Sequence, residues 1–364
     1  MPDFGFLEAF LYNYFYAFSF ILRMKRLFPI IIILSFGILP MFAQYDAQIS
    51  NHWAAIGYFN PAYAGTSGNL EATALYRQQW LGVEGAPRTA LATGEMPMYF
   101  LGRTHGIGAI FFTESIGLFN HTIVSGQYAY KKEMLKGVLS VGLQIGYISE
   151  SFKGSKLNFE IPAEDDYHEE ADESIPTTDV SGSAIDAAFG LMFSKPNWYV
   201  GFSATHLTAP QMELNENIVM EIPRAYYLTA GYNIQLNNPL LELRPTLLVK
   251  TTEMSPYMEQ PDSVTDIITG NKIKAMVTMM QVDLSARMIY NKTLWCGLGW
   301  RKGDAAVISL GGKFKVIEAG YAYDFPISSM LKGSTGSHEI FIKYIVDLNK
   351  KKGNRNKHKS VRIL

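Results

Sequence analysis

The chain has 364 residues, and its 33 acidic and 32 basic side chains leave a formal net charge of -1. This balance leaves no global positive field to attract nucleic acid, and the only basic run is the short tail at the end of the sequence, whereas nucleic-acid-binding proteins usually carry a basic domain or stripe. Charged residues make up 18% of the chain, against roughly 25% in an average soluble protein, and aromatic residues reach 13%. The single cysteine, Cys296, excludes an internal disulfide and a paired-thiol metal site, and we expect no lipoprotein anchor.

The N-terminal region predicts an export signal. A basic start at residues 24–26 precedes an almost wholly apolar run over residues 27–42, which ends at Ala43-Gln44. This arrangement is typical of a secretory signal peptide. A transmembrane helix is the alternative, but the run contains two prolines and is shorter than the roughly 20 residues needed to span a bilayer. We interpret residues 1–23 as an extension before the true start, or as part of one longer signal.

From Gln44 onward the dominant pattern is an alternation of apolar and small or polar residues. It is clearest over residues 138–149, where every second residue is apolar, namely Leu139, Val141, Leu143, Ile145 and Tyr147. A period of two predicts β-strands. These segments are as long as the roughly 9–11 residues of a transmembrane strand, whereas soluble strands average about 5–6. The apolar and aromatic side of each strand is expected to contact lipid. The opposite side, with Gly, Ser and single charges, is expected to point into the barrel interior.

The alternating segments predict an all-β fold, a transmembrane antiparallel β-barrel of about fourteen strands over residues 70–348. The strands are expected near 70–79, 88–98, 104–114, 120–132, 136–150, 183–194, 197–206, 224–236, 240–252, 275–290, 293–302, 305–313, 315–325 and 336–348. An even number is what bacterial single-chain barrels require. The long connection over residues 151–182 is then extracellular. A soluble β-sandwich, with shorter strands and fewer aromatic residues, is the alternative.

Charged residues within these strands are expected to point into the barrel. A charge on the lipid face costs roughly 2–4 kcal/mol at the bilayer midplane. By alternation the inward set comprises Arg77, Glu95, Arg244, Asp283, Arg287, Arg301, Glu318, Asp324 and Glu339. These side chains either brace the barrel or line a path for a solute or peptide.

Several short motifs follow one another along the chain in a characteristic order. They are Asn60-Pro61-Ala62-Tyr63-Ala64-Gly65, Tyr76-Arg77-Gln78-Gln79-Trp80, Gly85-Ala86-Pro87-Arg88-Thr89, Tyr128-Ala129-Tyr130, Gly320-Tyr321-Ala322-Tyr323-Asp324 and Ser337-His338-Glu339-Ile340. In this order and spacing the chain resembles the PorP/SprF family of type IX secretion-associated membrane proteins, from about residue 44 to 348. We expect the residues of these motifs, with the inward charges, to line the lumen or contact partners.

The resemblance implies an outer-membrane barrel that works with the type IX system and, in some members, with gliding motility. Such proteins help to deliver or hold a large secreted surface protein or adhesin. Some contact periplasmic components linked to the cell wall. The partners implied are therefore type IX components, a large secreted protein, a periplasmic cell-wall-linked protein and outer-membrane lipid. No cofactor or catalytic residue is implied, and a porin for small solutes is the alternative function.

The remaining motifs have ordinary interpretations beside the functional ones. Residues 60–65 form either a plug inside the barrel or a turn before the first strand, within an N-terminal segment over residues 44–69. His338-Glu339 lacks the second histidine of a zinc protease, because position 342 is Ile, and we expect no enzyme. The acidic run at 164–173 and the basic tail at 349–364 are expected to be solvated, with partner contact as the alternative.

Overall fold

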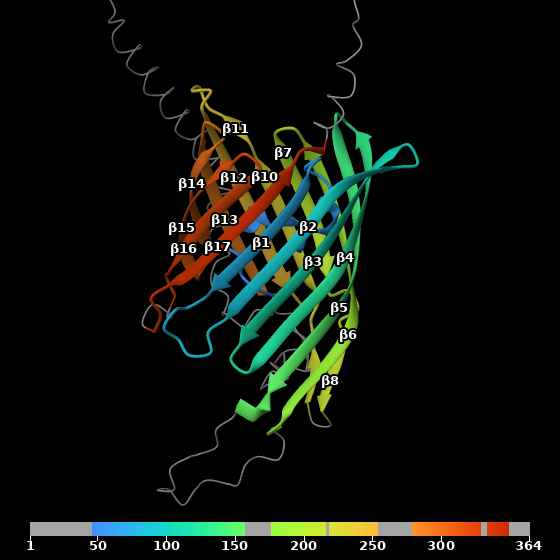
Figure 1. Ribbon diagram of the computed structural model, residues 1–364, viewed down its shortest axis with the longest axis vertical. Coiled ribbons are helices and arrows are strands. Elements are labelled where there is room, and N and C mark those ends of the chain that lie inside the picture. The colour runs from blue at the N-terminus through green and yellow to red at the C-terminus, as the bar shows by residue number, and fades with distance from the viewer. Residues whose placement is uncertain (1–45, 157–175, 216–217, 254–278, 329–332, 349–364) are drawn as a thin grey trace, which may run out of the picture. The chain divides into compact units, whose positions relative to one another are not determined.

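The computed structural model divides the chain into two units, residues 1–43 and residues 44–364, and describes only residues of the second (Figure 1). The described residues are 46–156, 176–215, 218–253, 279–328 and 333–348. The expected signal peptide, the acidic run and the basic tail lie outside these ranges. Within them, no helix is both long and apolar enough to cross a membrane.

Fourteen antiparallel strands form a closed barrel, as the alternation predicted. The strands are β1 (Leu70–Gln78), β2 (Arg88–Phe100), β3 (Arg103–Ile116), β4 (Phe119–Met134), β5 (Gly137–Lys153), β6 (Asp179–Lys195), β7 (Trp198–Thr205), β10 (Ala225–Tyr232), β12 (Leu241–Thr252), β13 (Met279–Tyr290), β14 (Leu294–Arg301), β15 (Ala305–Phe314), β16 (Ile317–Pro326) and β17 (Ser337–Val346). Each pairs with the next in this order, and β1 pairs with β17 to close the ring. A two-residue strand, β11 (Ile234–Gln235), extends the pairing along β12.

The burial of alternate residues follows the predicted faces. In β5, Ser140 is fully buried, whereas Ile145 is 69% exposed. In β17, Glu339 and Phe341 are buried and Ile340 and Ile342 are more than half exposed. The apolar side chains therefore point outward to the membrane, where a soluble protein would bury them, because lipid is their solvent.

The two ends of the barrel differ in the length of their connections. The turns at residues 101–102, 135–136 and 196–197 are tight, and Leu70 of β1 lies opposite Val346 of β17 at this same end. The opposite end carries the longer connections, including residues 206–224 between β7 and β10. Long connections are extracellular and tight turns periplasmic in outer-membrane barrels.

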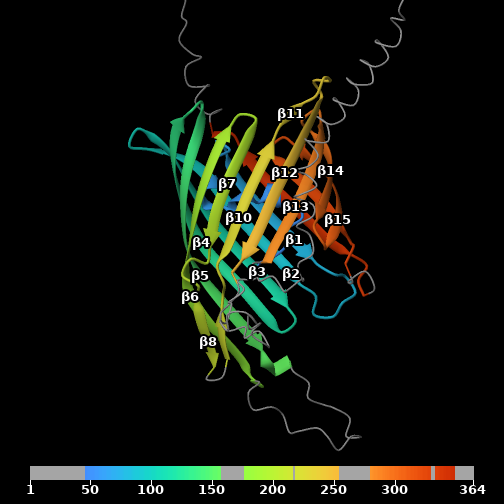
Figure 2. The same ribbon diagram turned by 180° about the vertical axis from the view of Figure 1, so that it is seen from behind.

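The long-connection end carries an element that the alternation did not predict. A hairpin of β8 (Gln211–Asn215) and β9 (Ile218–Glu221) packs against β6 and β5, as Figure 2 shows from behind. Met212 of β8 is buried there and Val219 of β9 is 59% exposed. Strands this short give too few repeats of the period for their pattern to be recognised.

Four short helices complete the described structure. Three lie between residues 52 and 63, namely η1 (His52–Ala54), α2 (Ile56–Phe59) and η2 (Pro61–Tyr63). The fourth, η3 (Gly154–Lys156), follows β5. The first three are too short to be stable alone, so packing against the barrel must hold them.

Candidate functional site

The N-terminal residues 46–69, called the inner segment here, pack against the inward-facing side chains of the barrel. Trp53 is 8% exposed, Phe59 is 2% exposed and Asn60 is fully buried. Trp53 and Phe59 share one apolar cluster with the inward residues Phe112 of β3 and Phe341 of β17. The inner segment thus lies against the inward-facing side chains of the barrel wall.

Aromatic contacts anchor the first half of the inner segment. The Trp53 ring meets the rings of Trp295 and Phe341 edge to face, at centroid distances of 5.1 and 5.3 Å. The Arg287 guanidinium carbon lies 3.2 Å from the Trp53 ring centroid. Aromatic pairs and a desolvated cation over an indole each add about 0.5–2 kcal/mol beyond simple burial. Arg287 is thus inward, as predicted, and stacked on the inner segment.

The barrel wall is lined with glycine where the backbone of residues 60–65 passes. A Cβ at Gly190 would lie 2.1 Å from Asn60 Oδ1, one at Gly142 would lie 2.2 Å from the Ala62 nitrogen, and one at Gly106 would lie 1.8 Å from the Ala64 oxygen. Real side chains do not fit at such distances. Glycine at these three strand positions therefore permits the close approach of a second backbone.

Asn60 fastens this backbone to the wall. Its Nδ2 donates to the carbonyl oxygens of Leu191 at 3.1 Å and Phe202 at 3.3 Å, and its Oδ1 accepts from the Ala62 backbone nitrogen at 2.9 Å. The Ser203 hydroxyl donates to the Phe59 carbonyl at 2.6 Å. Pro61 begins η2, where its missing N–H costs nothing. The Asn-Pro pair thus both caps the short helix η2 and fixes it to the barrel wall.

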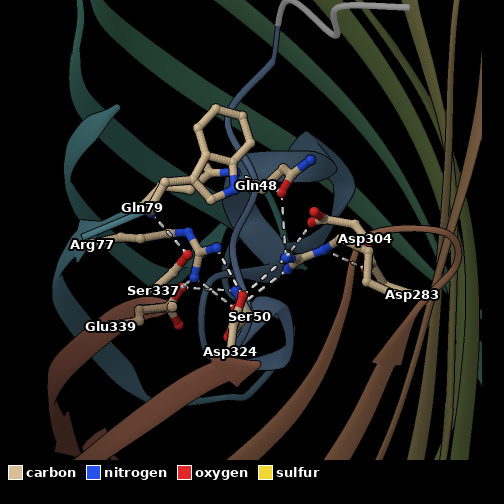
Figure 3. Close-up of polar contacts among 12 residues, drawn as sticks. Gln48, Ser50, Arg77, Gln79, Asp283, Asp304, Asp324, Ser337 and Glu339 are labelled. Carbon is tan, nitrogen blue, oxygen red and sulfur yellow. Dashed lines mark hydrogen bonds and ion pairs between the residues drawn. The ribbon is translucent and has the colours of Figure 1, made fainter. Parts of the chain in front are cut away.

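Charges from the wall converge on Ser50 of the inner segment (Figure 3). Arg77 Nη1 donates to Ser50 Oγ at 2.8 Å, and Ser50 Oγ donates to Asp324 Oδ1 at 2.7 Å. Asp324 is paired with Arg77 at 2.8 Å and with Arg301 at 3.0 Å. Arg301 also pairs with Asp283 at 2.8 Å. All four charged residues are nearly fully buried.

Glu339 extends this network to the backbone of the inner segment. Its two carboxylate oxygens accept from the Ser50 and Asn51 backbone nitrogens, each at 2.7 Å. Arg77 lies 3.6 Å from the same carboxylate. The Gln48 side chain accepts from Arg301 at 3.3 Å. The network therefore satisfies wall charges and inner-segment polar groups together, which is the bracing interpretation of the inward charges.

A second buried cluster holds the beginning of the inner segment. Asp46 lies 3.3 Å from His206 Nε2 and accepts from the Tyr227 hydroxyl, and its backbone oxygen accepts from Lys250 Nζ at 2.8 Å. His206 Nδ1 lies 2.9 Å from Asp186. Burial opposes ionisation, but the contacts with His206, Lys250 and Tyr227 outweigh it and hold the pKa of Asp46 well below its usual range. The cavity beside Asp46 measures about 20 Å³, room for a single water molecule.

Further contacts hold the middle and the end of the inner segment. Gln127 Nε2 donates to the Gly57 carbonyl at 2.8 Å, and Lys131 Nζ donates to the Thr66 hydroxyl at 2.7 Å. Within the wall, Lys343 of β17 pairs with Glu71 of β1 at 3.2 Å. Glu95 is buried in the same region, as the alternation predicted.

The remaining predicted site residues are not all inside. Thr89 is buried and donates to Glu114 at 2.6 Å, but Arg244 and Glu318 are only partly buried, and Arg244 pairs with Glu242 of its own strand. Tyr76 is 44% exposed on the outer face.

Other residues of the predicted motifs contact one another. An aromatic group is formed by Tyr321, Tyr323 and His338, with the Tyr321 hydroxyl 2.6 Å from His338 Nδ1. In the β1–β2 connection, the Trp80 nitrogen donates to Ser337 and the Pro87 oxygen accepts from Gln79. Gly65 adopts a left-handed φ of 64° against Met96 and Pro97.

The sequence interpretation missed Asp46, Gln48, Ser50, Asn51 and Trp53, which make the densest contacts with the wall. They lie before the first recognised motif and follow no period, so no sequence signal marked them. Among the described residues, no group of three or more His, Cys, Asp or Glu side chains is placed to hold a metal ion. The arrangement binds one chain segment through hydrogen bonds, buried charges and aromatic contacts.

Replacing Gly142 by Ala tests the glycine path. The new methyl group would overlap the Ala62 backbone and displace the inner segment, at a cost of about 1–3 kcal/mol. Chymotrypsin should then cleave at Trp53, Tyr58 and Phe59 faster than in the parent protein. The control is Gly126→Ala, since a Cβ at Gly126 meets no atom within 4 Å. Equal cleavage of both variants would contradict the close approach.

Replacing Arg301 by Met tests the buried network. Removing one partner of a buried ion pair typically costs about 3–5 kcal/mol, because the other charges lose their compensation. Arg244→Met is the control, as its pair with Glu242 is 36% exposed on the arginine side and should cost no more than about 1 kcal/mol. Urea unfolding of both proteins in the same detergent gives the two losses. Similar losses of unfolding free energy in the two variants would contradict a special contribution of the buried network to stability.

His52 makes docking of the inner segment sensitive to pH. Burial lowers the pKa of His52 from 6.5 to about 4, helped by the charges of Arg301 and Arg287 and opposed by Asp283. As the pH falls, His52 therefore takes up its proton at a higher pH in the unfolded chain than in the folded one. The stabilisation of the folded state that is present above pH 6.5 is lost as the pH falls toward about 4. The urea midpoint should fall less over this window in His52→Gln than in the parent. Parallel pH curves for the two proteins would exclude this role for His52.

Comparisons with known proteins give one family and several similar structures. A family model described as "Type IX secretion system membrane protein PorP/SprF" matches residues 41–344. No curated protein matches the chain. Among solved structures, the chain is similar to the CymD monoaromatic hydrocarbon channel, at 12% identity and a TM-score of 0.43 over 84% of this chain and 94% of that one. It is also similar to the Pseudomonas putida toluene transporter TodX, at 9% identity and a TM-score of 0.43 over 83% of this chain and 95% of that one. The chain is an outer-membrane β-barrel and belongs to the PorP/SprF family of type IX secretion system membrane proteins.

Proposed function

We propose that this protein is a barrel plugged by its own inner segment, which assists type IX secretion by holding or delivering a secreted surface protein through protein contacts. The observation that carries the proposal is the engagement of the wall's buried charges by the inner segment. Arg77, Arg301 and Asp324 all meet Ser50 or each other. A lumen used as a solute path would instead present such charges to water.

The partners proposed are those that family membership suggests. They are other type IX components, a large secreted surface protein or adhesin, and a periplasmic protein linked to the cell wall, with a role in gliding where the cell glides. The surface protein would be met at the long-connection end, where the β8–β9 hairpin presents Val219. The periplasmic partner would meet the end with the tight turns.

An affinity pull-down from detergent-solubilised outer membranes tests this proposal, with the co-purifying proteins identified by mass spectrometry. We expect type IX components or one very large surface protein. Val219→Asp should reduce recovery of the surface protein severalfold. Leu135→Asp, which changes a 74% exposed residue in a tight turn at the opposite end, is the matched control and should leave that recovery unchanged.

Planar-bilayer recording supplies the opposing outcome. The plugged barrel should show no steady conductance. Recovery of the barrel without partners, together with steady conductance, would establish the porin alternative and overturn the proposal.

A further inference from the structure

The outer face of the barrel carries a large hollow where β7, β10, β12, β13 and β14 run side by side. It is an open depression with a volume of about 790 Å³. Small residues at Ala230, Pro245 and Ala286 leave this space among larger ones such as Leu298 and Trp300. Leu298 is 68% exposed, which places the hollow on the lipid side of the wall.

The pairing of β10 with β12 is interrupted beside this hollow. It runs from Ala225 to Gly231, which lies opposite Thr246, and resumes in the same register where Ile234 lies opposite Leu243. The two unpaired positions on the β12 side are Arg244 and Pro245. Pro245 has no N–H to donate to a neighbouring strand, and proline is rare inside a sheet for this reason. The Asn233 nitrogen donates instead to the Asn197 oxygen at 2.7 Å.

The lining of the hollow selects the chemistry of its occupant. Its exposed lining surface is almost entirely apolar, and the hydroxyls of Thr246 and Ser285 are hydrogen-bonded to each other at 2.6 Å. A peptide entering the hollow would leave backbone N–H and C=O groups without partners, which is costly in an apolar setting. A hydrocarbon chain brings no such groups and gains from every methylene it buries.

The position of the hollow along the strands indicates where this chain comes from. Trp198 is the first residue of β7 and Tyr232 the last residue of β10, and both line the hollow next to the tight-turn end. Tight turns are periplasmic, and aromatic residues form girdles at the membrane–water interface. The hollow therefore begins at the periplasmic interface beside β7 and β10 and extends across the wall toward Trp300, near the other end of β14.

We propose that this hollow is a binding site for an acyl chain of a phospholipid from the periplasmic leaflet. The chain covers the stretch of wall in which the β10–β12 pairing is interrupted. It is held there more tightly than lipid at the smooth remainder of the barrel surface. The site is independent of the plug and of the secretion partners.

Native mass spectrometry of the full-length protein, purified in mild detergent, tests the proposal by counting retained phospholipid. The parent protein should keep bound phospholipid after detergent exchange. Ala230→Trp fills the hollow and should bind added phosphatidylethanolamine about tenfold more weakly, as the loss of contact with about two methylenes predicts. Ala74→Trp is the matched control, because Ala74 also faces outward, on β1, and it should bind like the parent.

Heat-modifiable mobility in electrophoresis would confirm that each variant is a folded barrel. If Ala230→Trp does not fold, the double variant Leu284→Ala and Leu298→Ala decides, since it removes exposed walls of the hollow and should also weaken binding. Equal phospholipid binding by the parent, the hollow variants and Ala74→Trp would overturn the site. So would a parent that retains no phospholipid, or a co-purifying protein that only the hollow variants lose.

Discussion

Two arginines and an aspartate of the barrel wall can be buried because Ser50 of the inner segment lies among them. Arg77, Arg301 and Asp324 come from three different strands, and each has a hydrogen bond to the Ser50 hydroxyl. Buried charges are tolerated only when they are paired and their remaining hydrogen bonds are made. The wall alone would leave part of this network facing an empty lumen. The inner segment is therefore a component of the barrel's stability, and the barrel in turn holds short helices that would not form alone.

The barrel wall and the inner segment also depend on each other at three glycines of the wall. Gly106, Gly142 and Gly190 weaken their strands as isolated elements, because glycine costs conformational entropy and adds no side-chain packing. These glycines allow the backbone of residues 60–65 to come close to the barrel wall, and no larger residue would leave room for it. Asn60 then uses carbonyl groups of β6 and β7 to fix the position along the barrel. Shape and hydrogen bonding specify one docked position.

The fourteen strands could be predicted because a period of two, sustained over ten residues, matches a β-strand and does not match a helix. The inward direction of Arg77, Asp283, Arg287, Arg301, Asp324 and Glu339 followed from the cost of a charge in lipid. That argument weakens near strand ends, where Arg244 reaches water and stays only partly buried. Ser50 and Asp46 could not be found in this way, because their partners are 27 to 289 residues away and no local pattern records such contacts. The motif residues Tyr321 and His338 alternate with inward neighbours, so membership of a motif did not give their direction.

The proposed plug decides which parts of the molecule remain available for other contacts. A conducting state would require the inner segment to leave. Arg301 would then keep its pairs with Asp283, Asp304 and Asp324 of the barrel but lose its hydrogen bonds to Ser50 and Gln48. The aromatic contacts of Trp53 and the hydrogen bonds of Asn60 would be lost as well. Any opening would have to be driven by a partner whose binding energy exceeds the sum of these contacts. Contacts at the two ends and on the outer face need no such driving, and these are the surfaces on which the proposed partner binding depends.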